Sequence, residues 1–223
     1  MPHRPHAVAF DVVETLVSLD AVDRALDEAG VGPYGLERFF GQLLRTGSAL
    51  AASRTYQPFG VVADAALASV APDLTASERE EVLAAFARLD AHPDARPALE
   101  RLSAAGVPAA TLTNGTAANT TTLLARTGLD SLVARVITIE EVRTWKPAPA
   151  PYLHAAAVLD VDASRLAMVA VHGWDVHGAH QAGLVTGWAS RLEGTFPRPF
   201  QPPDVTGADL VEVVDGLLAL PDS

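Results

Sequence analysis

The sequence predicts an α/β protein in which a doubly wound parallel sheet carries a helical insertion after its first strand. Short apolar runs, typical of strands buried on both faces, recur along the chain and alternate with helical segments that end at glycine. Residues 17–91 lack almost any strand pattern and interrupt this alternation. We therefore expect a core of residues 1–16 and 92–223, with right-handed crossovers, and a helical domain of residues 17–91.

The first strand is expected at Ala7 to Phe10, an apolar run that stops at Asp11. In the inserted segment, 3.6-residue periodicity, glycine stops and the candidate N-cap Thr75 predict helices. These helices are expected over residues 21–29, 36–50, 56–70 and 77–89.

From His92 onward, buried strands and helices alternate. Strands are expected over residues 107–113, 133–139, 166–171 and 184–189. Helices are expected over residues 97–105, 116–126, 151–159, 176–182 and 207–220.

The composition of the chain argues against several classes of partner and of catalysis. The 223 residues carry a formal charge of −11, which argues against nucleic acid and anionic membrane surfaces as partners. No segment approaches the roughly 20 apolar residues of a membrane helix, and no apolar signal region follows the N-terminus. The absence of cysteine excludes thiolate catalysis and disulfides. We expect a soluble, cytoplasmic protein.

The sixteen basic residues include a single lysine, Lys146. A genome that favours arginine codons would leave one lysine by chance. A site that needs a compact ammonium, which guanidinium cannot replace, would retain it for function. Composition alone leaves both explanations open.

Four groups of polar residues follow predicted strands, where the chemistry of open parallel sheets is located. Each group also has a structural explanation, such as capping a helix or forming a turn. The groups are Asp11 with Thr15, then Thr113-Asn114-Gly115, then Lys146, and finally His172 to Asp175.

In this order the four groups resemble the motifs of the haloacid dehalogenase superfamily: a strand-end aspartate, a Ser/Thr, a lysine and acidic residues after the fourth strand. The resemblance spans nearly the whole chain. It implies a Rossmann-like core of residues 1–16 and 92–223 with a helical cap, residues 17–91, that closes over the strand ends.

Within the superfamily, the sequence is most similar to the (S)-2-haloacid dehalogenase branch. The segments that carry this similarity are Phe10 to Leu16, Leu112 to Gly115, Lys146 to Tyr152 and Trp174 to Leu184. Phosphatases of the superfamily have a second aspartate two residues after the nucleophile, where this chain has Val13. Halide needs no proton to leave, so dehalogenation tolerates the absence of that acid.

The resemblance implies that Asp11 attacks the halogen-bearing carbon of a small anionic organic acid and that water hydrolyses the resulting aspartyl ester. Lys146 would hold Asp11 ionised, and Asp175 would orient Lys146 and activate the water. Thr15 and Thr113 would bind the substrate carboxylate, Asn114 would face the halide, and no metal or other cofactor is needed. The candidate substrate-binding residues are Asn114, Gly115, Arg45, Tyr152, His172 and Trp174.

Several positions differ from the dehalogenase pattern. Its cap arginine would fall at Gly41 or Gln42 here, so Arg45 is the nearest candidate. Ala170 stands in place of serine, and His172 stands in place of asparagine. His172 is either a base or water-positioning group or a strand-end histidine bonded to a neighbour.

Two alternative functions stay open. One is a magnesium-dependent phosphatase acting on small metabolites, which Val13 and Ala170 disfavour. The other is a protein that keeps the fold and binds a small acid or a partner without turnover. A homodimer formed through the cap helices is compatible with either.

Overall fold

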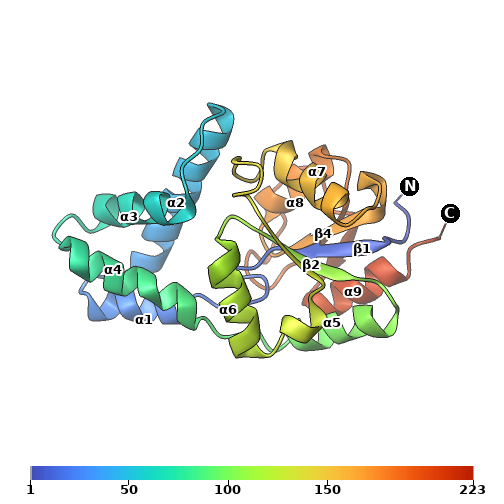
Figure 1. Cartoon of the computed structure of the whole chain (residues 1–223), viewed down its shortest axis with the longest axis horizontal. Coiled ribbons are helices and arrows are strands. Elements are labelled where there is room, and N and C mark those ends of the chain that lie inside the picture. Colours follow the sequence, from blue (N-terminus) through green and yellow to red (C-terminus); the bar gives the residue numbers. More distant parts are fainter. Residues whose placement is uncertain (1, 223) are drawn as a thin grey trace.

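The computed structural model describes residues 2–222, which form a six-stranded sheet and a separate block of helices beside it (Figure 1). All neighbouring strands are parallel, in the order β3-β2-β1-β4-β5-β6. The strands are β1 (Ala7–Phe10), β2 (Ala109–Thr113), β3 (Arg135–Thr138), β4 (Leu166–Ala170), β5 (Val185–Ala189) and β6 (Val205–Gly207). The predicted α/β fold class is confirmed.

The central strand β1 is buried along its whole length, as its apolar sequence requires. Ala9 pairs with Ala110 of β2 on one side and with Met168 of β4 on the other. The strand order reverses between β1 and β4, so the crevice beyond their carboxyl ends is the ligand-binding position of a doubly wound sheet. Asp11 and His172 lie at these two strand ends.

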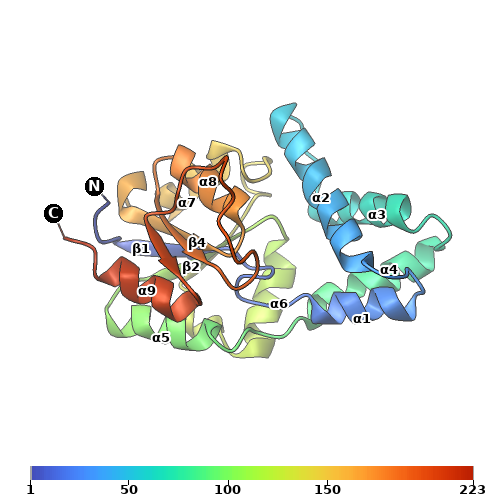
Figure 2. The same cartoon turned by 180° about the vertical axis from the view of Figure 1, so that it is seen from behind.

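Helices cover both faces of the sheet (Figure 2). One face is covered by α5 (Ala95–Ala104), α6 (Ala117–Thr127) and α9 (Leu210–Leu218), and the other by α7 (Pro149–Val158) and α8 (Gly173–Gln181). Short 3₁₀ turns η2 (Asp130–Leu132) and η3 (Ala163–Arg165) precede β3 and β4.

Several boundaries differ from the sequence prediction, among them those of the last helix and of α8. The segment expected to open the last helix contains β6, and α9 begins only at Leu210, capped by the Asp209 side chain. A three-residue edge strand is too short for a recognisable pattern. Helix α8 begins at Gly173 rather than Val176, which places Asp175 in its first turn, where the helix dipole favours a carboxylate.

The block of helices between β1 and α5, called the helical block below, comprises residues 20–88. It contains α1 (Asp20–Glu28), α2 (Gly35–Ala52), α3 (Phe59–Val70), α4 (Ala76–Ala84) and η1 (Ala85–Arg88). Thr75 forms a full capping box with Glu78, as its position predicted. Arg79 of α4 pairs with Asp64 of α3 at 2.7 Å.

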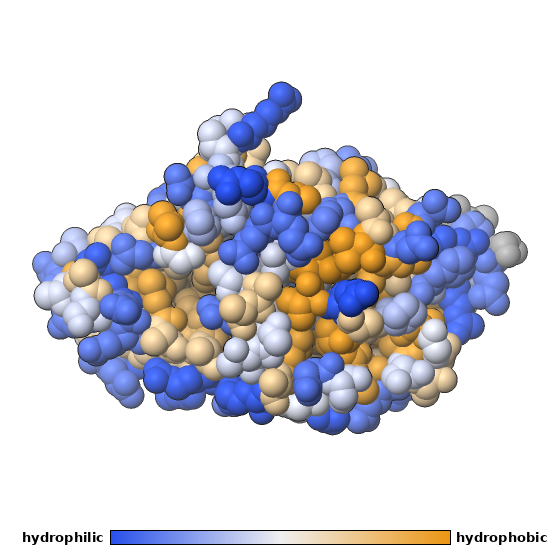
Figure 3. Space-filling view, viewed as in Figure 1, coloured by the Kyte–Doolittle hydropathy of each residue, from blue (hydrophilic) through white to orange (hydrophobic). Residues whose placement is uncertain are grey.

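The chain leaves and re-enters the core through two paired segments. Ser18 N donates to Asp90 O at 2.9 Å, and His92 N donates to Leu16 O at 2.9 Å. Apolar residues gather toward the middle of the face shown in Figure 3, and hydrophilic residues dominate its two ends. Within residues 2–222, no helix combines the length and apolarity required to cross a membrane.

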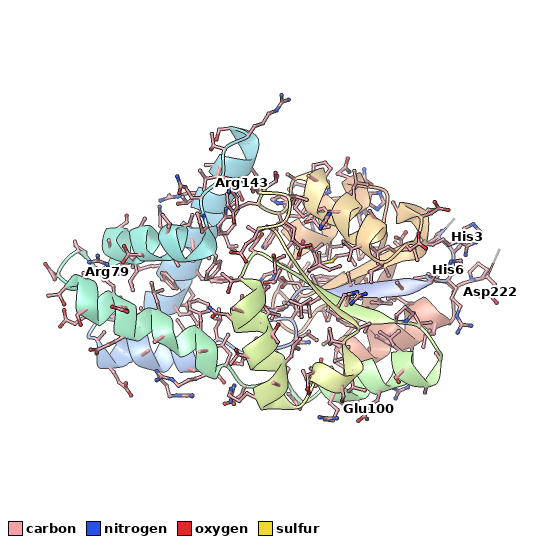
Figure 4. All side chains as sticks on the ribbon, in the orientation of Figure 1. His3, His6, Arg79, Glu100, Arg143 and Asp222 are labelled. Carbon is pink, nitrogen blue, oxygen red and sulfur yellow. The ribbon has the colours of Figure 1, made fainter. Side chains whose placement is uncertain are left out.

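The loop after β3 connects the core to the helical block. The buried Trp145 ring stacks on Phe59 of α3 at 6.1 Å between ring centres, and its Nε1 donates to Gln57 O at 2.9 Å. Arg143 of the same loop lies against the helical block, with its guanidinium 4.9 Å from the centre of the Tyr56 ring (Figure 4). Aromatic packing therefore fixes the helical block to the core.

Gly47 of α2 faces Trp145 so closely that any Cβ there would collide with the indole ring. We expect Gly47→Ala to lower the free energy of unfolding by about 1–3 kcal/mol, because the rigid ring must shift. Gly41→Ala on the same helix is the matched control, because nothing lies within 4 Å of its Cβ position. It should raise stability by up to about 1 kcal/mol through helix propensity. Urea unfolding measures both, and equal effects would contradict this packing.

Candidate active site

Asp11 directly follows β1, and the turn after it brings Thr15 back against its carboxylate. Leu16 N donates to Val12 O at 2.8 Å to close this turn. Thr15 Oγ1 donates to Asp11 Oδ2 at 2.9 Å and accepts from Val171 N at 3.2 Å. Asp11 is only 6 % exposed. The Thr15 hydroxyl thus directs its proton at Asp11, whereas the resemblance implied that it binds the substrate carboxylate.

Lys146 lies between two carboxylates and donates three hydrogen bonds from Nζ. The acceptors are Asp11 Oδ1 at 2.9 Å, Asp175 Oδ2 at 2.6 Å and Leu112 O at 2.9 Å. These bonds use all three ammonium protons, and the side chain is completely buried. Asn114 Oδ1 accepts from Lys146 N at 3.1 Å and fixes the backbone from which the lysine extends.

Asp175 receives a second strong hydrogen bond from Tyr152 of α7, whose hydroxyl donates to Oδ1 at 2.6 Å. Both side chains are fully buried. Each oxygen of Asp175 therefore has its own donor, and the carboxylate is fixed against Lys146.

This network shifts the pKa values of its members. Burial alone would raise the pKa of Asp11, but the Lys146 ammonium and then His172 outweigh it and hold that pKa well below its usual range. Burial alone would lower the pKa of Lys146, but Asp11 and Asp175 raise it above its usual value. Asp11 is consequently an unprotonated carboxylate and Lys146 a full cation throughout the physiological range.

His172 lies on the opposite side of Asp11 from Lys146. Its Nε2 is 2.8 Å from Glu14 Oε2, and its Nδ1 is 3.3 Å from Asp11 Oδ2. Burial would lower the pKa of His172, but the two carboxylates outweigh burial and raise it to about 10. The imidazole is therefore a cation in the free protein at neutral pH.

This ionisation predicts a change of stability at alkaline pH. A histidine in an unfolded chain titrates near 6.5, so the contribution of His172 to the free energy of unfolding is fully present below about pH 6.5. It should be lost as the pH rises from there through about 10. Urea unfolding at several pH values should show this decline in the wild type, and His172→Asn should weaken it. An identical decline in that variant would contradict the assignment.

The second strand ends at Thr113, whose Oγ1 accepts from Gly115 N at 3.0 Å. Thr116 then caps α6 by accepting from Asn119 N at 3.2 Å. This turn places the amide of Asn114 and the start of a helix on the same side as Asp11, and helix N-termini favour anions.

A small pocket opens above Asp11 between the core and the helical block. Its core side carries the polar side chains of Asp11, Thr113, Asn114 and His172, and its helical-block side is wholly apolar. The indole Nε1 of Trp174 is buried and has no hydrogen-bond partner in the described part of the chain. The lining residues are Asp11, Val13, Phe40, Leu43, Leu44, Phe59, Thr113, Asn114, Gly115, His172 and Trp174.

The structure brings most of the predicted residues together. One hydrogen-bonded cluster contains Asp11, Thr15, Lys146, Tyr152 and Asp175, with His172 beside it. The pocket adds the remaining predicted core residues, which are Thr113, Asn114, Gly115 and Trp174.

Arg45 is the exception, because the structure does not place it in the pocket. Helix α2 turns Phe40, Leu43 and Leu44 toward the pocket, so position 45 points elsewhere. The Arg45 side chain is exposed and donates to the Gln42 side chain of its own helix.

We expect Arg45→Ala to leave turnover and substrate affinity within about twofold of wild type, because exposed single contacts of this kind contribute little. Steady-state kinetics on the small anionic acid that the resemblance implies as substrate would measure this. A rise of KM by about tenfold or more would restore Arg45 as a substrate-binding residue.

Sequence reasoning missed Glu14 and the apolar lining. Glu14 has a φ of 64°, the left-handed region that favours glycine, yet carries a charged side chain directed at His172. The signal was its place three residues after Asp11, within the first of the four groups of polar residues. The missed lining residues are Val13, Phe40, Leu43, Leu44 and Phe59.

The residues around Asp11 do not fit a magnesium ion, which phosphatases of this fold use. The side chains of Val13 and Ala170 supply no oxygen ligand, and both oxygens of Asp175 are bonded to Lys146 and Tyr152. Two cationic side chains already face Asp11. Among residues 2–222, no three His, Asp or Glu side chains are placed to hold a metal.

Known proteins resemble the chain along most of its length. A model of the haloacid dehalogenase-like hydrolase family matches residues 5–183. (S)-2-haloacid dehalogenase 2 of Pseudomonas sp. (strain CBS-3) is 30% identical over 171 residues, 75% of this chain and 72% of that protein. The (S)-2-haloacid dehalogenase of Xanthobacter autotrophicus is 31% identical over 192 residues, 83% of this chain and 75% of that protein. A solved structure of the L-2-haloacid dehalogenase from Xanthobacter autotrophicus aligns with a TM-score of 0.86 at 26% identity, covering 95% of this chain and 97% of that one.

Proposed function

Because the chain belongs to the haloacid dehalogenase-like hydrolases, we propose that it is a 2-haloacid dehalogenase that replaces the halogen of a small anionic organic acid by a hydroxyl group. The observation that carries this proposal is the ionised Asp11, held by Lys146 at 2.9 Å, with Val13 where a phosphatase needs an acid. The relatives named (S)-2-haloacid dehalogenase support the same reaction.

In the first step, an oxygen of Asp11 attacks the carbon that bears the halogen, and halide leaves with the bonding electrons. The product is a neutral aspartyl ester. In the second step, water adds to the ester carbonyl carbon and the acyl–oxygen bond breaks. The substrate leaves as the hydroxy acid with the former Asp11 oxygen, and Asp11 is regenerated with an oxygen from water. Lys146 keeps Asp11 ionised for the first step, and Asp175 with Tyr152 keeps Lys146 in place.

The pocket provides donors for the two anionic parts of the substrate. We assign the substrate carboxylate to Thr113, Gly115 and the backbone at the start of α6, which offers the positive end of a helix dipole. We assign the departing halide to the Asn114 amide and the unpartnered Nε1 of Trp174. A weakly hydrated halide fits such uncharged donors beside apolar side chains.

The helical block acts as the cap in this proposal, with residues 17–91 forming one domain and residues 1–16 and 92–223 the other. Its apolar side chains exclude water from Asp11, which strengthens the electrostatic interactions within the site. Closure of the cap would therefore remove water from the Asp11 carboxylate and leave its oxygens free to attack the substrate.

Halide release is the test of the proposed function. The purified protein is incubated with the S and R forms of 2-chloropropionate and 2-bromopropionate, and with chloroacetate and fluoroacetate, without added metal. We expect halide release from at least one short 2-haloacid. We expect a preference for the S form, because the relatives are named (S)-2-haloacid dehalogenases. No release from any of them, together with turnover of p-nitrophenyl phosphate in magnesium, would replace the proposal by a phosphatase.

We further propose a cytoplasmic location and a homodimer formed through the helical block. Tyr34 and Val61 are exposed on that block, at 74 % and 53 %. Phe39 is buried within the block and is not available to such an interface. Analytical ultracentrifugation of wild type and Val61→Glu measures the assembly, and a monomer at all concentrations would contradict it.

A further inference from the structure

Helix α8 begins beside the nucleophile, yet its own N-cap residue does not cap it. His172 occupies the N-cap position, and its imidazole is directed at carboxylates of the site instead of at the first backbone N–H groups of the helix. Glu193, from the loop between β5 and β6, supplies the missing acceptor, because its Oε2 accepts from Gly173 N at 3.0 Å. The helix dipole favours a carboxylate at this end of a helix.

The same carboxylate oxygen also fixes the other end of the turn from β4 into α8. Trp188 Nε1 donates to Glu193 Oε2 at 3.2 Å and to Val171 O at 3.0 Å. Val171 and Gly173 are the neighbours of His172 in the chain. Glu193 and the buried Trp188 indole therefore hold the backbone on both sides of His172.

The loop that carries Glu193 is packed closely against α8. A Cβ at Gly173 would lie 2.6 Å from Pro197 Cδ, so only glycine lets the loop come this near to the start of the helix. Phe196 of the loop packs edge-on against the Trp188 indole, with ring centres 5.2 Å apart. These contacts hold Glu193 at the start of α8, although the residue itself is exposed.

Trp174 is the residue of the site that depends most on this arrangement. Its indole Nε1 is buried, and within residues 2–222 no hydrogen-bond partner fixes it. The ring is held by packing, with its centre 5.5 Å from that of His172 and 5.9 Å from Lys146 Nζ. The position of the indole at the pocket wall therefore follows the backbone at Gly173, which Glu193 anchors.

We propose that Glu193 is a positioning residue for halide departure, which holds the turn from β4 into α8 so that the Trp174 Nε1–H group meets the leaving halide. This inference rests on the proposed function, in which that N–H group binds the departing halide. Glu193 does not line the pocket, so it acts on the reaction through Trp174. Donors fixed in advance stabilise the charge that develops on a leaving group, and a shift of about 1 Å can cost roughly 10²-fold in rate.

The test measures halide release in a single turnover, which isolates the first step. Wild type, Glu193→Ala, Glu193→Asp and Glu193→Gln are each mixed, in excess, with the chloro and bromo forms of a haloacid that the wild type converts. We expect Glu193→Ala to release chloride roughly tenfold or more slowly than wild type and bromide within about threefold, because chloride leaves less readily and depends more on its donor. Glu193→Asp keeps the charge but is one methylene shorter, so it should behave like the alanine variant.

Two variants separate positioning from helix capping. Glu193→Gln keeps an oxygen that can accept both hydrogen bonds, so chloride release should return to within about threefold of wild type. Glu78→Ala is the matched control, because it removes another carboxylate that accepts a backbone N–H group at a helix start, that of α4 in the helical block. It should lower the urea midpoint, as Glu193→Ala does, yet release both halides like wild type. Circular dichroism verifies that each variant is folded, and Glu193→Asp carries the comparison if the alanine variant is not.

A double-mutant cycle shows whether Glu193 acts through Trp174. Trp174→Phe removes the N–H donor and keeps an aromatic ring, so chloride release should slow in this variant as well. Adding Glu193→Ala to Trp174→Phe should then change chloride release by less than about twofold, because the donor that Glu193 positions is already absent.

The possible results are distinguishable. Chloride release at the wild-type rate in Glu193→Ala overturns the inference and leaves the proposed function intact. Equal slowing of chloride and bromide release, or equal slowing in Glu78→Ala, also overturns it, since the effect would then be structural. Additive effects of Glu193→Ala and Trp174→Phe would overturn the action through Trp174. Absence of halide release from every short 2-haloacid in the wild type overturns the proposed function itself.

Discussion

Asp11→Asn is expected to reduce halide release by about 10⁴-fold or more, because the amide has no anionic oxygen to attack carbon. The substitution keeps the shape of the side chain and its neighbours Thr15 and Lys146. The loss should therefore appear in kcat with the protein still folded. Halide electrode measurements at saturating haloacid give the ratio.

A single turnover in ¹⁸O-labelled water shows whether Asp11 acts through an ester. In wild type, the first product should carry an unlabelled hydroxyl oxygen derived from Asp11, and one labelled oxygen should remain on that residue. Asp64→Asn, which breaks a partly buried ion pair with Arg79 within the helical block, is the control and should release halide like wild type. Label in the product of the first turnover would show direct attack by water and exclude Asp11 as nucleophile.

Lys146→Met is expected to have the second largest effect, on both stability and activity. It leaves two buried carboxylates, Asp11 and Asp175, without their shared cation, which costs about 3–5 kcal/mol in the free energy of unfolding. Only His172 then opposes the effect of burial, so the pKa of Asp11 rises relative to wild type and the acid limb of the pH–rate profile should move to higher pH. Urea unfolding and kcat between pH 4 and 9 measure the two effects.

Lys146→Arg tests whether charge alone suffices. The ammonium makes three short hydrogen bonds in a fully buried site, and a planar guanidinium cannot reproduce that arrangement. We expect the arginine variant to keep less than about a hundredth of wild-type turnover. Near wild-type turnover would show that the single lysine of the chain reflects codon preference rather than chemistry.

Much of the core and of the candidate site followed from the sequence, because both depend on local patterns. Buried strands are recognisable as apolar runs, and residues placed just after parallel strands must meet at one sheet edge. Asp11, Thr113, Lys146 and Asp175 were all identified in this way, and the structure brings them to that edge. The resemblance to haloacid dehalogenases, which rested on the same residues, is confirmed by the family match.

The remainder depends on tertiary geometry that no local pattern encodes. The direction of Arg45 is set by how α2 is rotated against the core, and one helical position is enough to turn it away. The bond between Glu14 and His172 joins residues 158 positions apart. The sequence could not show that the Thr15 hydroxyl donates to Asp11 and accepts from Val171 N, because both bonds depend on how the strands are arranged.

The contact of Trp145 with the helical block has a consequence for how this enzyme could evolve or be rebuilt. The residue that anchors α2 and α3 directly precedes the lysine that governs the nucleophile. A foreign helical insert that replaced residues 17–91 by recombination would remove Gly47 and Phe59, against which the Trp145 ring packs. Without that packing, the loop would no longer hold Lys146 in position against Asp11. The two halves of the molecule are therefore not interchangeable modules, and new substrate ranges are more accessible by point substitutions at Phe40, Leu43 and Leu44.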